Sequence, residues 1–156
     1  MLSIGKLLTE EQGRLMVRRV VSVDDGTAKV ETTYESAGSF GDVHYTDLGT
    51  LWSYIRPDGT LFGEWKGGLR TDGNDTAVYR GITGGTYIET TKHSRTYRGA
   101  LTFENARGAL TELNSVLAIF EMEIDDTGKL NYRTWKLEDR SPERICGESV
   151  ANERER

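Results

Sequence analysis

The residues most able to do chemistry lie around one short turn, Pro57–Gly59. If this turn closes a β-hairpin, alternation places Glu64 on the same face as Tyr54 and Phe62. The same register puts Trp52 directly across from Glu64. A carboxyl group that aromatic rings shield from water has a raised pKa and can transfer a proton. We therefore take Glu64 and Tyr54 as candidate catalytic residues.

A structural alternative for Glu64 is a cross-strand ion pair with Lys66 or with an arginine on an outer wall. Aromatic residues occur at one or two per predicted strand, and those that line a cavity would hold a flat or elongated apolar ligand. The candidate ligand-binding residues are His44, Trp52, Phe62, Arg98, Phe120, Met122 and Tyr132. For His44 the alternative is a hydrogen-bonded or exposed side chain near a strand start. The pattern leaves open which face of the sheet points inward.

Other kinds of site are poorly supported. His44 and His93 are isolated, and Cys146 is the only cysteine, so no metal-ligand spacing is present. The chain has no Gly-x-Ser-x-Gly motif for a nucleophilic serine. Gly63–Gly68 lies within a predicted strand and does not precede a helix, which argues against a phosphate loop. We expect no metal and no cofactor.

Composition narrows the class of protein. The chain has 156 residues, which fits one domain, and its formal net charge is −5, with Lys and Arg scattered among acids. This pattern disfavours a nucleic-acid partner. No apolar run is long enough for a signal peptide or a membrane-spanning helix, and one cysteine allows no internal disulfide. We expect a cytoplasmic protein with a small hydrophobic molecule as partner and no membrane contact, and a homodimer is allowed.

Eight segments of strand character follow one another, separated by turns in which Gly or Asn supplies a positive φ. They are Arg14–Val23, Lys29–Ala37, Asp42–Arg56, Thr60–Arg70, Thr76–Tyr87, Arg95–Phe103, Val116–Ile124 and Leu130–Leu137. Thr9 and Gln12 have capping-box spacing, so Leu2–Gln12 is predicted to form one or two helical turns. Glu104–Ser115 is a longer crossing, predicted to hold a helical turn across a barrel mouth. Residues 1–138 are predicted as the domain and 139–156 as a charged, flexible tail.

A sheet of about eight strands with one apolar face must pack on a second layer or close on itself. No predicted helix covers the sheet. Mid-strand glycines, which relieve strong coiling, occur at Gly49, Gly63, Gly67, Gly81 and Gly99. We therefore predict an all-β fold, a single antiparallel up-and-down barrel of calycin-like type. A two-sheet sandwich is the alternative.

Two local patterns indicate which residues share a face. A hairpin around Asp126–Gly128 pairs Met122 with Tyr132, Phe120 with Thr134, and Glu121 with Arg133. Ile124, Met122, Phe120 and Ala118 then form one apolar stripe, predicted to face the core. The sequence Tyr-Arg-Gly occurs at 79–81 and 97–99, which predicts adjacent strands with Tyr and Gly on one face and Arg on the other.

The order of these motifs resembles that of a known group of proteins. The motifs are TDLGT (46–50), RPDGTLFG (56–63), YRG (79–81), YRGAL (97–101) and FE (120–121). They are similar to those of small uncharacterised bacterial and archaeal proteins with calycin-like or allene-oxide-cyclase-like β-barrels. The resemblance spans roughly residues 13–137 and implies a pocket for a small apolar ligand. Some barrels of that type act as cyclases or isomerases, but no catalytic residue carries over.

Three functional hypotheses follow. The first is a small-molecule-binding barrel for an apolar or aromatic ligand. The alternative is a cyclase or isomerase that folds a hydrophobic, polyketide-like or lipid-like substrate inside the barrel, with Glu64 or Tyr54 moving a proton. The third is a packed barrel whose outer surface binds a partner protein.

Overall fold

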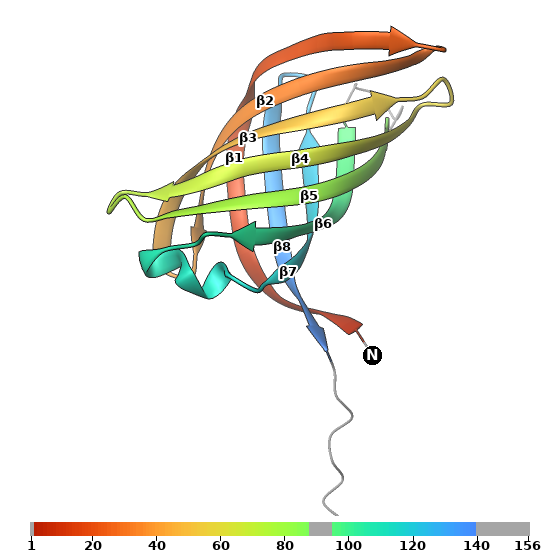
Figure 1. Ribbon diagram of the computed structural model, residues 1–156. Coiled ribbons are helices and arrows are strands. Elements are labelled where there is room, and N and C mark those ends of the chain that lie inside the picture. Colours follow the sequence, from red (N-terminus) through yellow and green to blue (C-terminus); the bar gives the residue numbers. More distant parts are fainter. Residues whose placement is uncertain (1, 88–94, 140–156) are drawn as a thin grey trace, which may run out of the picture.

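The chain forms one closed barrel of eight antiparallel strands, in a computed structural model that describes residues 2–87 and 95–139 (Figure 1). The strands are β1 (Leu2–Asp24), β2 (Thr27–Phe40), β3 (Val43–Ile55), β4 (Thr60–Thr71), β5 (Thr76–Tyr87), β6 (Arg95–Glu104), β7 (Leu117–Ile124) and β8 (Lys129–Asp139), and a 3-10 helix, η1 (Gly108–Leu113), lies between β6 and β7. Each strand pairs with the next, and β8 pairs with β1 to close the ring. The predicted up-and-down barrel is confirmed, and the sandwich alternative is wrong.

Some predictions concern parts of the chain that the structure does not describe. Residues 140–156 of the predicted tail, with Cys146, and also His93, lie outside the described ranges. Asp139, which was assigned to the tail, is the last residue of β8. No helix between residues 2 and 139, the gap at 88–94 excepted, has the length and apolar character needed to cross a membrane.

Burial alternates along the strands and shows which face points inward. In β4, Leu61 and Trp65 are buried, whereas Phe62 and Glu64 are exposed. The predicted registers of the Pro57 hairpin and of the β7–β8 hairpin are both confirmed. The apolar stripe of β7, from Ala118 to Ile124, lies in the core as predicted.

The two Tyr-Arg-Gly copies lie on neighbouring strands, β5 and β6, as expected. Tyr79 and Tyr97 are buried in the barrel, and Arg80 and Arg98 are exposed on its outside. This arrangement confirms that the tyrosines and glycines of the repeat share the inner face.

The prediction of helical turns over Leu2–Gln12 is wrong, because β1 begins at Leu2. This segment pairs with β8 along most of its length and with β2 from Thr9 onward. A local capping interaction of Thr9 cannot compete with ladder hydrogen bonds on two sides. Instead, the Thr9 Oγ1 atom lies 2.6 Å from the Thr134 Oγ1 atom in a buried hydrogen bond where the barrel closes.

The predicted crossing between β6 and β7 contains η1, which covers one end of the barrel (Figure 1). Leu110 and Leu113 of η1 are fully buried in the core. The Ala109 backbone N–H donates to Asp75 Oδ2 at 3.0 Å, and the Arg107 N–H donates to the Thr76 carbonyl at 2.9 Å. These bonds fasten the crossing to the β4–β5 turn at this end of the barrel.

Two glycines make room for the hydroxyl ends of tyrosine rings at the inner wall. Gly49 and Gly67 are cross-strand partners in β3 and β4. A Cβ atom at Gly67 would overlap the Tyr79 hydroxyl, and one at Gly49 would overlap the hydroxyls of Tyr34 and Tyr79. The phenol rings therefore occupy the space that side chains would fill at these two positions.

Gly67→Ala is expected to lower the free energy of unfolding by about 1–3 kcal/mol, the usual range for an overpacked core. The matched control is Gly68→Ala, because a Cβ atom there finds its nearest neighbour, the Ala77 carbonyl oxygen, at 3.7 Å. Urea denaturation of both variants measures the difference. Equal stability of the two variants would show that Tyr79 does not pack over Gly67.

Candidate functional site

Two carboxyl groups lie inside the barrel, surrounded by hydroxyl groups. Glu11, from β1, and Asp47, from β3, are 2% and 1% exposed. We call the set of these two residues and their hydrogen-bond donors the interior acid cluster: Glu11, Tyr34, Ser36, Tyr45, Asp47 and Tyr79. All six side chains are buried.

The sheet register brings the members of the cluster together. Ser36 and Asp47 are cross-strand partners in β2 and β3. Tyr45 precedes Asp47 by two residues on the same strand, so both side chains point inward. Glu11 stands across from Gly38, where the missing side chain leaves room for the longer carboxylate arm.

Glu11 accepts two hydrogen bonds from neighbouring hydroxyls. The Ser36 Oγ atom donates to Oε2 at 2.6 Å, and the Tyr45 hydroxyl donates to Oε1 at 2.8 Å. Both distances lie within the normal range for O–H···O hydrogen bonds. They hold the carboxyl group of Glu11 in one orientation inside the barrel.

Asp47 is held by two tyrosines. The Tyr79 hydroxyl donates to Oδ2 at 2.8 Å, and the Tyr34 hydroxyl lies 3.3 Å from the same oxygen. The hydroxyls of Tyr34 and Tyr79 also contact each other. The indole N–H of Trp65 donates to the Tyr34 oxygen at 2.6 Å, which links Asp47 to the aromatic core.

Burial sets the electrostatics of the two acids. Loss of water raises the pKa of Glu11 to about 7, although the hydrogen bonds from Ser36 and Tyr45 oppose that rise. Burial, followed by the charge on Glu11, raises the pKa of Asp47 well above its ordinary value. Each carboxyl group thus feels the charge of the other. They therefore titrate together and retain a proton at neutral pH.

Two further buried hydroxyls complete the polar lining of the interior. Tyr132 is the cross-strand neighbour of Glu11, and Ser53 lies on the inner face of β3. Within residues 2–87 and 95–139, the oxygens of these two side chains have no hydrogen-bond partner. The pKa of Tyr132 is raised by burial and then by the charges on Glu11 and Asp47.

An aromatic shell surrounds the cluster. Trp65 packs edge-on against four rings, with centroid distances of 4.4 Å to Phe120, 4.8 Å to Tyr132, 5.5 Å to Tyr79 and 5.8 Å to Tyr34. Such surroundings have a low effective dielectric constant, so charges on the acids act strongly on one another. The described residues include no group of three His, Cys, Asp or Glu side chains suited to a metal ion.

This arrangement suits proton transfer or the binding of a polar group. A carboxyl pair that holds one proton offers a hydrogen-bond donor and an acceptor at the same place. A group with a pKa near 7 can also give and regain a proton at neutral pH.

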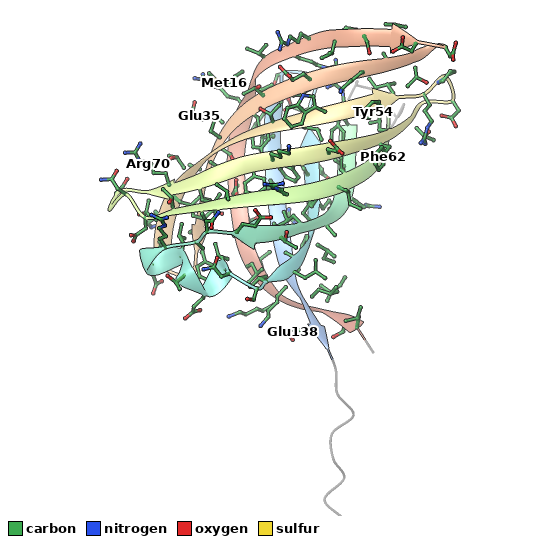
Figure 2. The ribbon with its side chains drawn as sticks, viewed as in Figure 1. Met16, Glu35, Tyr54, Phe62, Arg70 and Glu138 are labelled. Atoms are coloured by element: carbon green, nitrogen blue, oxygen red, sulfur yellow. The ribbon has the colours of Figure 1, made fainter. Side chains whose placement is uncertain are left out.

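The aromatic face of the Pro57 hairpin lies on the outside of the barrel. Glu64 is exposed, so the prediction that rings shield it from water is wrong. Tyr54 and Phe62 stack on each other on the outer wall of β3 and β4, with ring centroids 6.3 Å apart (Figure 2). The Trp52 indole donates to Glu31 Oε2 at 2.9 Å on the same wall. The reason is the register: Trp65 points inward, so Glu64, the preceding residue, must point outward.

The other predicted site residues divide between the two faces. His44 and Arg98 are exposed on the outside. Arg98 pairs with Glu121 at 2.7 Å, whereas the ladder neighbour of Glu121, Arg133, pairs with Glu10 at 3.3 Å. Glu121 and Arg133 are thus ladder neighbours as predicted, but each forms an ion pair with another residue.

Three predicted ligand-binding residues do face the interior: Phe120, Met122 and Tyr132 are all buried. Phe120 and Tyr132 pack on Trp65, and Tyr132 adjoins Glu11. These three are the predicted site residues that the structure brings to the interior acid cluster.

Sequence reasoning missed both acids of the cluster. Glu11 fell in the segment predicted as helical, and Asp47 was noticed only as part of a glycine motif. A usable signal was present, because Glu11 and Gly13, like Asp47 and Gly49, stand two residues apart on one strand face. An acid on the face that carries the core glycines must be buried once the barrel closes.

The raised pKa of Glu11 predicts how stability depends on pH. In the folded protein the Glu11 carboxyl keeps its proton up to about pH 7, whereas in the unfolded chain it loses that proton near pH 4.5. The free energy of unfolding should therefore fall as pH rises between these values, by on the order of 3 kcal/mol. Urea denaturation across this range tests the expectation.

The double variant Glu11→Gln/Asp47→Asn should lose most of this pH dependence. The exposed Glu64→Gln variant is the control and should behave as the parent protein does. A parent protein that keeps the same stability across the range, or gains stability as pH rises, would contradict a buried protonated pair.

Comparison with known proteins identifies proteins of the same fold, and none of them has a stated function. No protein-family model matches the chain, and no curated protein matches it. A protein of unknown function from Clostridium acetobutylicum superposes with a TM-score of 0.74 at 13% identity, covering 88% of this chain and 100% of its own. A conserved protein of unknown function from Rhodopseudomonas palustris superposes with a TM-score of 0.71 at 10% sequence identity. The superposition covers 88% of this chain and 99% of that protein. A β-barrel-like protein from Acinetobacter baumannii superposes with a TM-score of 0.73 at 11% sequence identity. The superposition covers 88% of this chain and 97% of that protein. At these identities the chain shares a small barrel fold with bacterial proteins of unknown function.

Proposed function

We propose that the barrel binds a small molecule with an apolar or aromatic body and one polar group, which hydrogen-bonds to the interior acid cluster. The observation that carries this proposal is the pair of buried carboxyl groups, Glu11 and Asp47, with hydroxyl donors around them. The packing of the fold does not explain why two acids occupy this position.

Stability alone disfavours the two acids. Removing a carboxylate from water costs several kcal/mol, and well-packed neutral side chains in the same space are commonly more stable. No ion pair between described residues involves Glu11 or Asp47; the described ion pairs, such as Arg98–Glu121, lie on the outside. Residues that lower stability in a buried position are typical of functional sites.

The chemistry of the cluster suggests the kind of ligand. A carboxyl pair with one proton matches a carbonyl or hydroxyl group, which accepts or donates a hydrogen bond. Tyr132, the cross-strand neighbour of Glu11, offers one additional hydroxyl to the same ligand. Trp65, Phe120 and Met122 are buried in the packed interior, so the body of a bound ligand would take a place among these apolar side chains.

A second candidate is catalysis of a proton transfer, as in a cyclase or isomerase acting on a hydrophobic, polyketide-like or lipid-like substrate. It is favoured by the pKa of about 7 for Glu11, which suits a general acid or base. In this proposal Glu11 and Asp47 take the role first considered for Glu64 and Tyr54. A cyclase or isomerase activity agrees with the resemblance to calycin-like or allene-oxide-cyclase-like barrels. That resemblance is itself part of the proposal.

A cytoplasmic location also belongs to the proposal. It is supported by the single cysteine of the sequence, Cys146, which allows no intramolecular disulfide.

The test of ligand binding uses Trp65 as the reporter. The chain has three tryptophans, so Trp65 is the one that remains in the variant Trp52→Phe/Trp135→Phe. A panel of bicyclic and long-chain ketones, alcohols and hydrocarbons, including the pair 1-tetralone and tetralin, is titrated against its fluorescence. We expect the ketones and alcohols to quench the Trp65 fluorescence in a saturable way. The matched hydrocarbons should quench it less or not at all.

Adding Glu11→Gln/Asp47→Asn should weaken binding of the oxygen-bearing compounds by at least about tenfold, as expected for loss of a buried hydrogen-bonding site. Adding Glu64→Gln should leave binding unchanged. The proposal fails if no compound of the panel gives saturable quenching, or if binding is equally tight without the two interior acids.

A further inference from the structure

The outer face of three neighbouring strands, β7, β8 and β1, is apolar near one end of the barrel. In Figure 1 the start of β1 and the end of β8 lie together below the rest of the barrel. Trp135 of β8 is the cross-strand partner of Ile119 in β7 and of Leu7 in β1, and Leu137 is the partner of Ile4. With the next residue of the same face in β1 and in β7, these side chains form what we call the outer apolar patch: Leu2, Ile4, Leu7, Leu117, Ile119, Trp135 and Leu137.

Much of the outer apolar patch is in contact with water. Leu2 is 66% exposed, Ile4 62%, Leu7 47% and Leu117 44%. The other three side chains are half-buried. Single exposed apolar side chains are common on protein surfaces, whereas a group of them on adjacent strands is typical of a contact site.

Charged residues border the patch on the side that faces the middle of the barrel. Glu121, Arg133 and Glu10 form a cross-strand row at the next outward position of β7, β8 and β1. Arg133 pairs with Glu10 at 3.3 Å, and Arg98 pairs with Glu121 at 2.7 Å. We call these four residues the charged rim. An apolar centre beside a polar rim is the usual composition of a protein–protein interface.

The charged rim indicates which kind of partner fits the patch. Its two arginines and two glutamates pair within the chain, so the rim has no excess charge with which to attract a charged partner. Anionic lipid headgroups would be repelled by the formal net charge of −5. A second copy of the chain brings the same apolar centre and the same balanced rim, and is therefore complementary in charge.

The shape of this surface also suits a second copy. A recess of about 320 Å³ lies on the outer wall of β5, β6 and β7, and Ile82, Ala100 and Leu117 are among the residues that line it. Leu117 belongs to both the recess and the patch, so the two are continuous. A two-fold interface uses the same surface on both copies. Here that surface supplies both projecting side chains, such as Ile4, and a recess.

We propose that the protein forms a two-fold symmetric homodimer in which the outer apolar patches of the two copies pack against each other. The contact removes the exposed apolar side chains from water, which is the main source of stability in such interfaces. This proposal does not depend on the proposed ligand, because the interior acid cluster lies on the inner side of the wall.

Charged substitutions in the patch test the proposed contact. Ile4→Glu and Leu117→Glu, each alone, place a carboxylate in the apolar interface and should raise the dimer dissociation constant by at least about tenfold. The matched control is Leu48→Glu, because Leu48 is 62% exposed, as Ile4 is, but lies on the outer face of β3. This control should leave the constant unchanged. Sedimentation velocity over a range of protein concentrations measures each constant, with near-ultraviolet circular dichroism as the check of folding.

Protection from alkylation locates the contact without disrupting it. A trace amount of Leu7→Cys/Cys146→Ser is mixed with increasing amounts of the Cys146→Ser protein, and the alkylation rate of the introduced thiol is followed. The rate should fall as the dimer forms, whereas the rate for Leu48→Cys/Cys146→Ser should stay constant. A parent protein that is monomeric at every concentration would overturn the proposal. So would a dimer whose dissociation constant neither Ile4→Glu nor Leu117→Glu changes, or one in which the thiol at position 7 is not protected.

Discussion

A closed eight-stranded barrel has to fill its own interior, and here the large side chain of Trp65 meets that requirement. From β4 its ring contacts side chains of β2, β5, β7 and β8. A ring of that size fits because glycines elsewhere on the inner wall leave room for the tyrosines around it. The packing density of a protein core allows few gaps, so each aromatic ring needs a matching small residue. The way the wall closes is thus fixed by three rings, Trp65, Tyr34 and Tyr79, together with the glycines at 49 and 67.

The same packing determines where the polar groups go. The hydroxyl ends of Tyr34 and Tyr79 lie over the glycines, and both hydroxyls reach Asp47. The indole N–H of Trp65 then finds a partner in Tyr34, so the aromatic core and the acid share one hydrogen-bond network. Glu11 joins from β1 through Ser36 and Tyr45. A network that satisfies most of its members specifies one arrangement of the interior and holds its carboxyl groups in fixed orientations.

Sequence patterns were sufficient for the architecture. Turn glycines and alternation predicted eight strands, and the registers of the β3–β4 and β7–β8 hairpins were correct because each turn leaves little freedom in pairing. The beginning of β1 was misjudged, since its strand character comes from pairing with β8, more than 110 residues away in the sequence. A local cap signal at Thr9 carries no information on such a long-range contact.

The site was harder to predict than the fold, for a related reason. Alternation shows which residues share a face but not which face points inward. In the Pro57 hairpin the aromatic face with Glu64 resembled a pocket, whereas the glycine-rich face with Trp65 was the inner one. Glycines on a barrel strand mark places where a neighbouring ring lies over the wall, and this argues for the glycine-rich face. Once that face is chosen, Asp47 and Glu11 follow as interior residues from the register alone.

The account depends most on the statement that Glu11 and Asp47 share a proton inside the folded barrel at neutral pH. Carbon-13 NMR of the labelled side-chain carboxyl groups, followed as a function of pH in the native protein, measures this directly. We expect the Glu11 carboxyl signal to titrate with a pKa of about 7 and the Asp47 carboxyl to titrate with a pKa well above its ordinary value. Titration of both carboxyl groups below about pH 5, where exposed acids lose their protons, would contradict the account.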